Sequence, residues 1–266
     1  MDFTHSQILF AFFLTAIAGL STGIGSLIAL LAKKTNKNFL SISLGFSAGI
    51  MIYVSFMEMM PRALQELSAG YGEKTGTLYL IFAFFAGIVL INLIDFLIPE
   101  QINPHEAHEV EEMYKSTQLK RTGIMVAISI SIHNFPEGIA TFTSALSALD
   151  VAIPITVAIA IHNIPEGIAV AVPIYHATGN RKKAFWLSFL SGLSEPAGAL
   201  LAFLFLTHFW TPTLNGLILA AVSGIMLFIS LDELLPSAEK YGKHHLSIIG
   251  VVSGMLVMAL SLFLFI

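Results

Sequence analysis

The 266-residue sequence contains no cysteine, and only 11% of its residues are charged. The missing cysteines exclude disulfides and thiolate metal ligands. Soluble domains usually carry about a quarter charged residues, so this chain has too few to cover a surface in water. No basic run with interleaved aromatics is present, which excludes nucleic acid as a partner. With 56% hydrophobic residues, the chain is predicted to be an all-α integral membrane protein whose surroundings are the lipid bilayer.

The N-terminus reads MDFTHSQILFAFF and has no lysine or arginine before its apolar run. A secretory signal peptide needs a basic segment at that place, so this stretch is predicted to be a retained membrane helix. Apolar stretches of roughly 20 residues predict eight membrane spans in one domain of residues 1–266. They cover residues 6–32, 38–60, 77–98, 122–144, 151–174, 184–206, 213–235 and 246–266.

The one long connection, residues 99–121, is acidic and contains His105 and His108. Two interpretations stay open for this loop: a flexible solvated segment and a specific metal site.

The basic residues fall almost entirely on one side of the predicted membrane. The connections between spans 1–2, 3–4, 5–6 and 7–8 hold 3, 3, 3 and 2 lysines and arginines, which makes 11, whereas the other side holds only Arg62 and Lys74. Basic loops face the cytoplasm. The sequence therefore predicts a multi-pass protein of the cell (inner) membrane with both termini outside and the 99–121 loop in the cytoplasm.

Two segments near the ends of the chain repeat each other. GIMIYVSFMEMMPRA (49–63) matches GIMLFISLDELLPSA (224–238), and GLSTGIGSLIA (19–29) matches GLSEPAGALLA (192–202). Spans 1–3 thus match spans 6–8, and a shift of five spans reverses the direction across the membrane. The pattern predicts inverted repeats around the antiparallel spans 4 and 5, an arrangement typical of secondary transporters.

Two nearly identical octets, HNFPEGIA at 133–140 and HNIPEGIA at 162–169, lie within the two central spans. In each octet the histidine and the glutamate are four residues apart and share a helix face. Imidazole nitrogen and carboxylate oxygen bind zinc and neighbouring divalent metals, and the amide oxygen of asparagine is a weaker ligand. The octets predict a metal site with the candidate ligands His133, Asn134, Glu137, His162, Asn163 and Glu166.

A third intramembrane carboxylate, Glu195, lies in SGLSEPAGAL of span 6. Buried glutamates cost several kcal/mol unless they are paired or bind metal. Three glutamates with two neutral histidines suit one or two divalent cations, and the charge balance favours two, bridged by Glu137 and Glu166. A polar network that only holds the helices together is the alternative interpretation.

Prolines accompany each of these carboxylates. Pro136 and Pro165 lie in the middle of their spans, and Pro196 follows Glu195 directly. A proline removes a backbone donor and crowds the carbonyl four residues back. We therefore expect the helices to be interrupted there, with free carbonyls lining a cavity.

Further acidic residues flank the central site along the chain. Glu58 is predicted near the outer end of span 2, and Asp95, Asp232 and Glu233 near the cytoplasmic ends of spans 3 and 7. Together with Ser55 and Ser230, which recur at matching positions of the repeats, they form a candidate transport pathway. Ordinary solvation at the membrane interface is the alternative for these acids.

The paired HNxPEG motifs, SEPAG in span 6 and the SxxExxP pattern in spans 2 and 7 resemble the ZIP (Zrt/Irt-like) metal transporters over the whole chain. The resemblance implies import of Zn²⁺, and of Fe²⁺, Mn²⁺, Co²⁺ or Cd²⁺, as a substrate rather than a cofactor. It implies one subsite of His133, Glu137, His162 and Glu166, and a second of Asn134, Glu137, Asn163, Glu166 and Glu195. Some family members have aspartate where Asn163 stands here. The resemblance also suggests an elevator-like movement and a homodimer.

The sequence thus predicts a metal importer that is not an enzyme. An intramembrane zinc hydrolase, in which a metal-bound water attacks the substrate, is the alternative. The inverted repeats and the acids on both sides of the membrane argue against it. A metal sensor is a third hypothesis, for which the sequence offers no signalling domain.

Overall fold

The computed structural model describes residues 3–31, 37–96, 131–132, 134–146, 149–241 and 243–264. All regular elements in these ranges are helical, as predicted, and the part of the chain from 134 to 146 is also a helix. The other elements are α1 (His5–Leu31), α2 (Lys37–Val54), η1 (Ser55–Met59), α3 (Met60–Tyr71), α4 (Glu73–Phe96), α6 (Leu149–Thr178), α7 (Arg181–Gly192), α8 (Ser194–Leu201), η4 (Ala202–Leu206), η5 (Thr207–Phe209), α9 (Pro212–Ile229), η6 (Ser230–Leu234), α10 (Leu235–Tyr241) and α11 (His244–Leu264).

Seven stretches among the described residues are long and apolar enough to cross a membrane, and they confirm seven of the predicted spans. The eighth prediction, 122–144, is described only from residue 131 onward, where it is helical except at the undescribed residue 133. The predicted loop 99–121 lies outside the described residues. Large apolar side chains are exposed along α1, α4 and α11, so these helices present hydrocarbon to the bilayer.

Two of the predicted spans are shorter than the corresponding helices in the structure. The span 38–60 continues through Asn38–Tyr71, and the span 213–235 continues to Lys240. A proline, Pro61 or Pro236, directly follows the predicted end of each span. In both cases a five-residue π-helical segment precedes the proline: the backbone N–H of Met60 bonds to the carbonyl of Ser55, and that of Leu235 to Ser230. This wider turn accommodates the proline, and the helix goes on.

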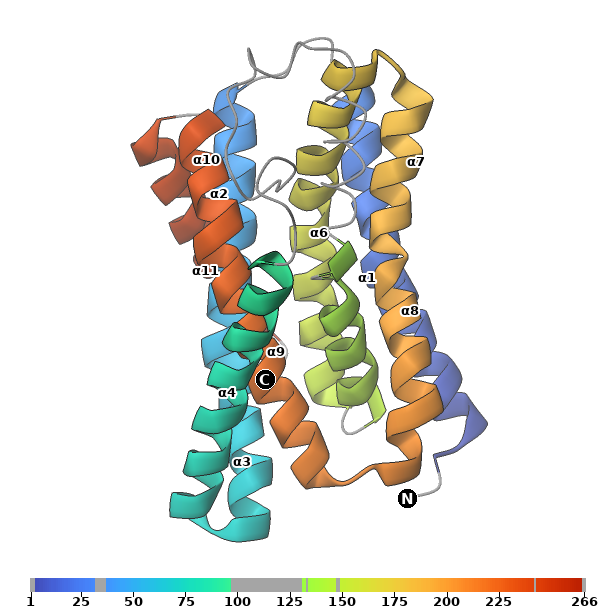
Figure 1. Ribbon diagram of the computed structural model, residues 1–266, viewed down its shortest axis with the longest axis vertical. Coiled ribbons are helices and arrows are strands. Elements are labelled where there is room, and N and C mark those ends of the chain that lie inside the picture. The colour runs from blue at the N-terminus through green and yellow to red at the C-terminus, as the bar shows by residue number, and fades with distance from the viewer. Residues whose placement is uncertain are drawn as a thin grey trace.

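Local signals set several helix ends. Asn180 accepts a hydrogen bond from the backbone of Lys183 (3.1 Å) and caps α7, and Thr211 caps α9 in the same way through Leu214 (3.1 Å). Gly179, at φ 62°, ends α6 in the left-handed conformation that favours glycine. These caps place the 5–6 and 6–7 connections at opposite ends of the molecule (Figure 1).

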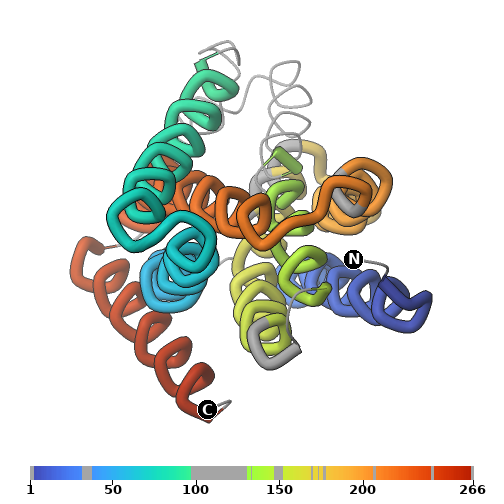
Figure 2. Tube along the Cα trace, turned by 90° about the horizontal axis from the view of Figure 1, so that it is seen from below, coloured from blue at the N-terminus to red at the C-terminus, as the bar shows by residue number. Residues whose placement is uncertain are grey.

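The helices form two bundles (Figures 1 and 2). The first bundle contains α1, the helix of residues 134–146, α6, α7 and α8. The second bundle contains α2, η1, α3, α4, α9, η6, α10 and α11. Between the described elements of the two bundles, the main packing is α2 against α6, where the hydroxyl of Ser47 donates to the carbonyl of His162 over 3.3 Å.

The second bundle carries the inverted repeat in its packing. Gly49 of α2 lies so close to the backbone of Val251 in α11 that an added Cβ would overlap its carbonyl. Gly224 of α9, the repeat equivalent of Gly49, meets Phe84 of α4 in the same way. The π-helical segments η1 and η6 also occupy matching positions, and α2 and α9 run in opposite directions (Figure 1). The two halves of the repeat therefore share their backbone geometry as well as their sequence.

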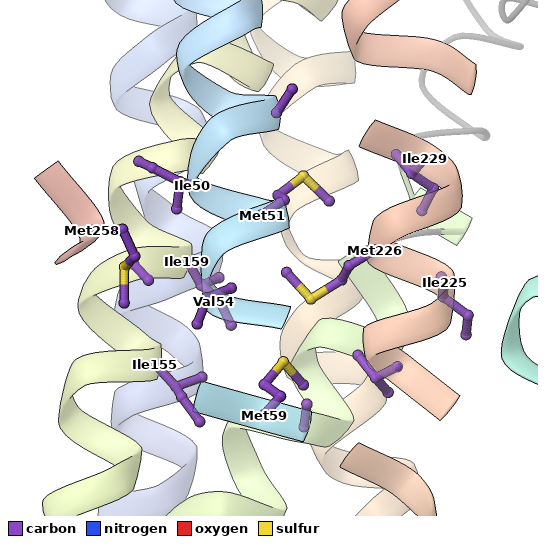
Figure 3. Close-up of a cluster of buried hydrophobic side chains, with 14 of the residues drawn as sticks. Ile50, Met51, Val54, Met59, Ile155, Ile159, Ile225, Met226, Ile229 and Met258 are labelled. Atoms are coloured by element: carbon purple, nitrogen blue, oxygen red, sulfur yellow. The ribbon is translucent and has the colours of Figure 1, made fainter. Parts of the chain in front are cut away.

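The junction between the bundles is an apolar core rich in methionine (Figure 3). Met51, Met59, Met226 and Met258 are each at most 1% exposed, and they pack in one cluster with isoleucines of α6 and α9. By contrast, every close backbone approach at a glycine of the described residues joins helices of the same bundle. Each bundle is tightly packed internally, and flexible side chains separate the two.

Candidate metal site

Polar side chains are buried where α6, α8, α1 and the helix of residues 134–146 meet. Asn134, Glu137, His162, Glu166 and Glu195 are each at most 1% exposed. They are thus shielded from the lipid, and Nε2 of His162 in one octet lies 3.3 Å from Oε2 of Glu137 in the other. His133 lies outside the described residues.

His162 is held in one orientation by its own helix. Its Nδ1 lies 3.1 Å from the carbonyl oxygen of Ala158. A carbonyl only accepts, so Nδ1 carries the proton and, in the neutral ring, Nε2 carries the lone pair. That lone pair points toward Oε2 of Glu137 at 3.3 Å and Oε1 of Glu166 at 3.9 Å. With the ring neutral, the lone pair of Nε2 and the carboxylate oxygens of Glu137 and Glu166 therefore point toward one another. A cation bound between them would interact favourably with all three groups.

Asn163 joins three helices through its amide nitrogen. Nδ2 donates to the carbonyl of Ala18 in α1 over 2.9 Å and makes a very short contact with Oε1 of Glu195 in α8. Oδ1 of Asn163 and Oε2 of Glu195 have no hydrogen-bond partner among the described residues. The two oxygens are buried acceptors with unused lone pairs, which are costly in the absence of a ligand.

The helix of residues 134–146 presents a polar face. Both amide atoms of Asn134 and Oε1 of Glu137 have no hydrogen-bond partner among the described residues, and the same holds for the hydroxyls of Thr141 and Ser144. The spacing of three, four and three residues puts all four side chains on one side of the helix. Sequence reasoning missed Thr141 and Ser144, although this spacing from Asn134 was a usable signal.

The backbone brings the carboxylates close because the glycines allow it. Gly138 lies directly against the backbone of Glu195, and Gly167 against that of Thr22 in α1; a Cβ at either glycine would overlap the neighbouring carbonyl oxygen. Each glycine follows a motif glutamate, so close approach and ligand position depend on each other.

The described residues alone do not form a metal cage. No group of three or more histidine, cysteine, aspartate or glutamate side chains within them has the arrangement needed to hold an ion. Their donors face one another in pairs instead, Glu137 with His162 and Asn163 with Glu195. An ion would therefore have to draw these pairs apart, and His133 would have to complete the set.

The expected interruption at Pro165 is wrong, since α6 continues from Leu149 to Thr178 through this proline. The loss of one backbone hydrogen bond is tolerated because neighbouring helices pack on all sides of α6. A break does occur next to Pro196: α7 ends at Gly192, Leu193 forms a turn, and α8 starts at Ser194. Pro136 lies within helical residues: 134 and 135 before it are helical, as are 131 and 132, and only residue 133 is not described.

The candidate pathway residues lie away from the central site. Ser55 and Glu58 belong to η1, and Ser230, Asp232 and Glu233 to η6. Both serines are fully buried, Glu58 and Glu233 are half-buried, and Asp232 is exposed. Asp95 is half-buried in the last turn of α4, while the elements that pack closely on η6 are α2, α9 and α10. The predicted grouping of Asp95 with the acids of η6 stays a prediction.

Comparison with known proteins identifies related chains. A family model described as "ZIP Zinc transporter" matches residues 97–262. The zinc transporter ZupT of Streptococcus mutans is 62% identical over 263 residues, which cover 98% of this chain and 100% of the relative. The zinc transporter ZupT of Clostridium perfringens is 55% identical over 278 residues, with 98% of both chains covered. That of Nitratidesulfovibrio vulgaris is 55% identical over 271 residues, with 97% and 98% covered.

Proposed function

Because this chain belongs to the ZIP family of zinc transporters, we propose that it imports Zn²⁺ into the cytoplasm by alternating access around the buried His/Asn/Glu site. The relatives compared above are named zinc transporters, which makes zinc the first candidate substrate. Fe²⁺, Mn²⁺, Co²⁺ and Cd²⁺ are further candidates, because the site mixes nitrogen and oxygen ligands without thiolates. The hydrolase alternative has no support, since the family consists of transporters.

One observation carries the assignment of the site. With Nδ1 of His162 committed to the carbonyl of Ala158, the lone pair of Nε2 faces the carboxylates of Glu137 and Glu166 inside the membrane. A structural hydrogen-bond network would place a donor at that position. A divalent cation bound there would accept the lone pair and neutralise the carboxylates.

Two ions fit the ligands better than one. Oε2 of Glu137 faces His162, whereas Oε1 has no described partner, so the two oxygens are disposed to serve different ions. The first subsite would use His133, His162 and the two motif glutamates. The second would use Asn134, Asn163, Glu195 and the same glutamates as bridges. Because asparagine stands at 163, the second subsite has one charge fewer than in members with aspartate, and we expect it to hold its ion more loosely.

The route to the site is lined by oxygen atoms. We assign Thr141 and Ser144 to the route from outside, since they continue the face of Asn134 and Glu137 toward the end of the molecule that contains α3 (Figure 1). Glu58 and Ser55 would contribute from η1. Ser230, Asp232, Glu233 and Asp95 would serve the route to the cytoplasm. Hydroxyl and carboxylate oxygens replace part of the hydration shell of the moving ion.

The difference between packing within and between the bundles supports an elevator-like movement. Backbone contacts at glycines hold each bundle as one body. The Met51, Met59, Met226 and Met258 side chains at the junction are flexible and repack at low cost, so the first bundle can slide past α2 (Figure 3). The hydrogen bond from Ser47 to the carbonyl of His162 would break during this movement.

The orientation and assembly follow from the charges and the family. The first turn of α7, which contains Arg181 and Lys183, and α10, which contains Lys240, lie at the end of the molecule opposite to α3, which contains Arg62 (Figure 1). This arrangement agrees with a cytoplasmic basic side. We therefore place the chain in the cell (inner) membrane with both termini outside. The homodimer remains a prediction from the resemblance.

The test is metal uptake into proteoliposomes that contain the purified protein. Wild type should accumulate Zn²⁺, and Glu137→Ala and Glu166→Ala should each lower uptake by more than about 100-fold, because loss of a shared ligand affects both ions. Glu73→Ala is the matched control, since Glu73 is exposed in the first turn of α4. Absence of wild-type uptake would reject the importer function. Normal uptake by the glutamate variants would reject the site instead.

A further inference from the structure

Thr22 of α1 is a buried hydroxyl that the assignment above does not use. It is fully buried, and its Oγ1 has no hydrogen-bond partner among the described residues. Buried hydroxyls in membrane helices normally bond to the carbonyl three or four residues back, as Thr15 does with Ala11 over 2.9 Å in the same helix.

The reason lies at the carbonyl that Thr22 would use. The carbonyl of Ala18, four residues back, accepts from the hydroxyl of Ser21 over 2.6 Å and from Nδ2 of Asn163 over 2.9 Å. The regular helix adds the backbone N–H of Thr22 itself. Three donors therefore already share this carbonyl, which has two lone pairs. Asn163 of the metal site thus competes with the Thr22 hydroxyl for the carbonyl of Ala18.

The surroundings of Thr22 belong to the same site. Its backbone carbonyl lies against Gly167, the residue that follows Glu166. Its Oγ1 packs against Gly192, where an added Cβ would lie 2.9 Å away, and Glu195 comes three residues later on α8. Thr22 is thus packed between α6, which carries Glu166, and the last residue of α7, three positions before Glu195.

The inverted repeat relates Thr22 to a residue on the opposite side of the central site. GLSTG of α1 matches GLSEP of residues 192–196, so Thr22 is the counterpart of Glu195. The packing is matched too: the Glu195 backbone lies on Gly138 as the Thr22 backbone lies on Gly167. Glu195 contacts Asn163. In the repeat, Asn134 is the counterpart of Asn163, and neither its amide atoms nor the Thr22 hydroxyl has a hydrogen-bond partner among the described residues.

We propose that the Thr22 hydroxyl is a further oxygen ligand of the transported ion, next to Asn134 and opposite Glu195. This inference rests on the proposed function. A neutral hydroxyl adds a hard donor without adding charge, so the ligand set holds three carboxylates instead of four. Hard oxygen donors matter more for Mn²⁺ than for Zn²⁺. Thr22 therefore widens the range of metals that the site accepts.

The experiment compares Mn²⁺ and Zn²⁺ uptake by Thr22→Val, Thr22→Ser and Thr15→Val in proteoliposomes. Thr22→Val removes the hydroxyl and keeps the shape, and we expect it to raise the KM for Mn²⁺ roughly 3- to 10-fold, the effect of one neutral polar contact. The KM for Zn²⁺ should change less. Thr22→Ser should stay within about twofold of wild type, and Thr15→Val, which loses only a hydrogen bond to its own helix, should leave the ratio of the two KM values unchanged.

The possible outcomes distinguish a failure of the proposal for Thr22 from a failure of the central site. An unchanged ratio of KM values in Thr22→Val, together with lost uptake in Glu137→Ala, would overturn the role of Thr22 and keep the central site. Normal uptake in Glu137→Ala would overturn the central site itself. If Thr22→Val does not fold, Thr22→Ala replaces it in the same comparison. A purely structural role would lower the Tm of the variant without shifting the ratio.

Discussion

The two sides of the central site have equal backbones and unequal chemistry. On one side Glu195 approaches Gly138 and binds the amide of Asn163; on the other, Thr22 approaches Gly167, and Asn134 has no described partner. Duplication accounts for the equal geometry, since close helix packing requires the glycines on both sides. If these side chains bind the ion, as proposed, they can differ without disturbing the packing of the helix backbones.

This difference teaches how the site balances charge. Four carboxylates around the ions would bind them tightly and repel one another when the ions leave. A hydroxyl at Thr22 and an amide at Asn163 keep oxygen donors in place at lower charge. Loose binding is what a transporter needs, because every ion that enters the site must also leave it.

Among variants that reduce the chemical difference between the two sides of the site, Glu195→Gln is expected to have the largest effect. It removes the charge that distinguishes the two sides while it keeps the size and an amide oxygen. Loss of a charged ligand should lower Zn²⁺ uptake by more than about 100-fold, measured in proteoliposomes against the exposed control Glu73→Gln. Uptake within a few fold of wild type would show that Glu195 does not bind the ion.

A smaller effect is expected from Gly138→Ala and Gly167→Ala, which test whether the backbone packing is the same on the two sides of the site. Each new Cβ would overlap a backbone carbonyl of the facing helix. Overpacking of this kind costs about 1–3 kcal/mol, so the Tm in detergent should fall by a similar amount, about 2–10 °C, in both variants. Uptake should suffer more in Gly138→Ala, which displaces Glu195, than in Gly167→Ala, which displaces Thr22. A fall of Tm in only one variant would contradict the symmetry.

Much of the fold could be predicted because the information is local or repeated. Apolar stretches identified the spans, and the matches 49–63 with 224–238 and 19–29 with 192–202 reappear as matched glycine contacts. The burial of Glu137, His162 and Glu195 followed from a motif in the middle of apolar spans. Such patterns report which residues face the interior of a membrane protein.

The errors concern effects that depend on neighbouring helices. Pro165 was expected to interrupt its helix, yet tight packing accommodates it, and the span predicted to end at residue 60 continues past Pro61 through a π-turn. Thr22 was missed for the same reason. Asn163, far away in the sequence, occupies the carbonyl of Ala18, which the Thr22 hydroxyl could otherwise use. No spacing within α1 contains that information.

The most direct test of the central claim is anomalous scattering from crystals of the protein soaked in Zn²⁺. The account predicts two strong peaks between α6 and the helix of residues 134–146, one of them about 2.0–2.2 Å from Nε2 of His162 and from a carboxylate oxygen of Glu137. Peaks confined to surface histidines such as His244, with His162 still paired to Glu137, would contradict it.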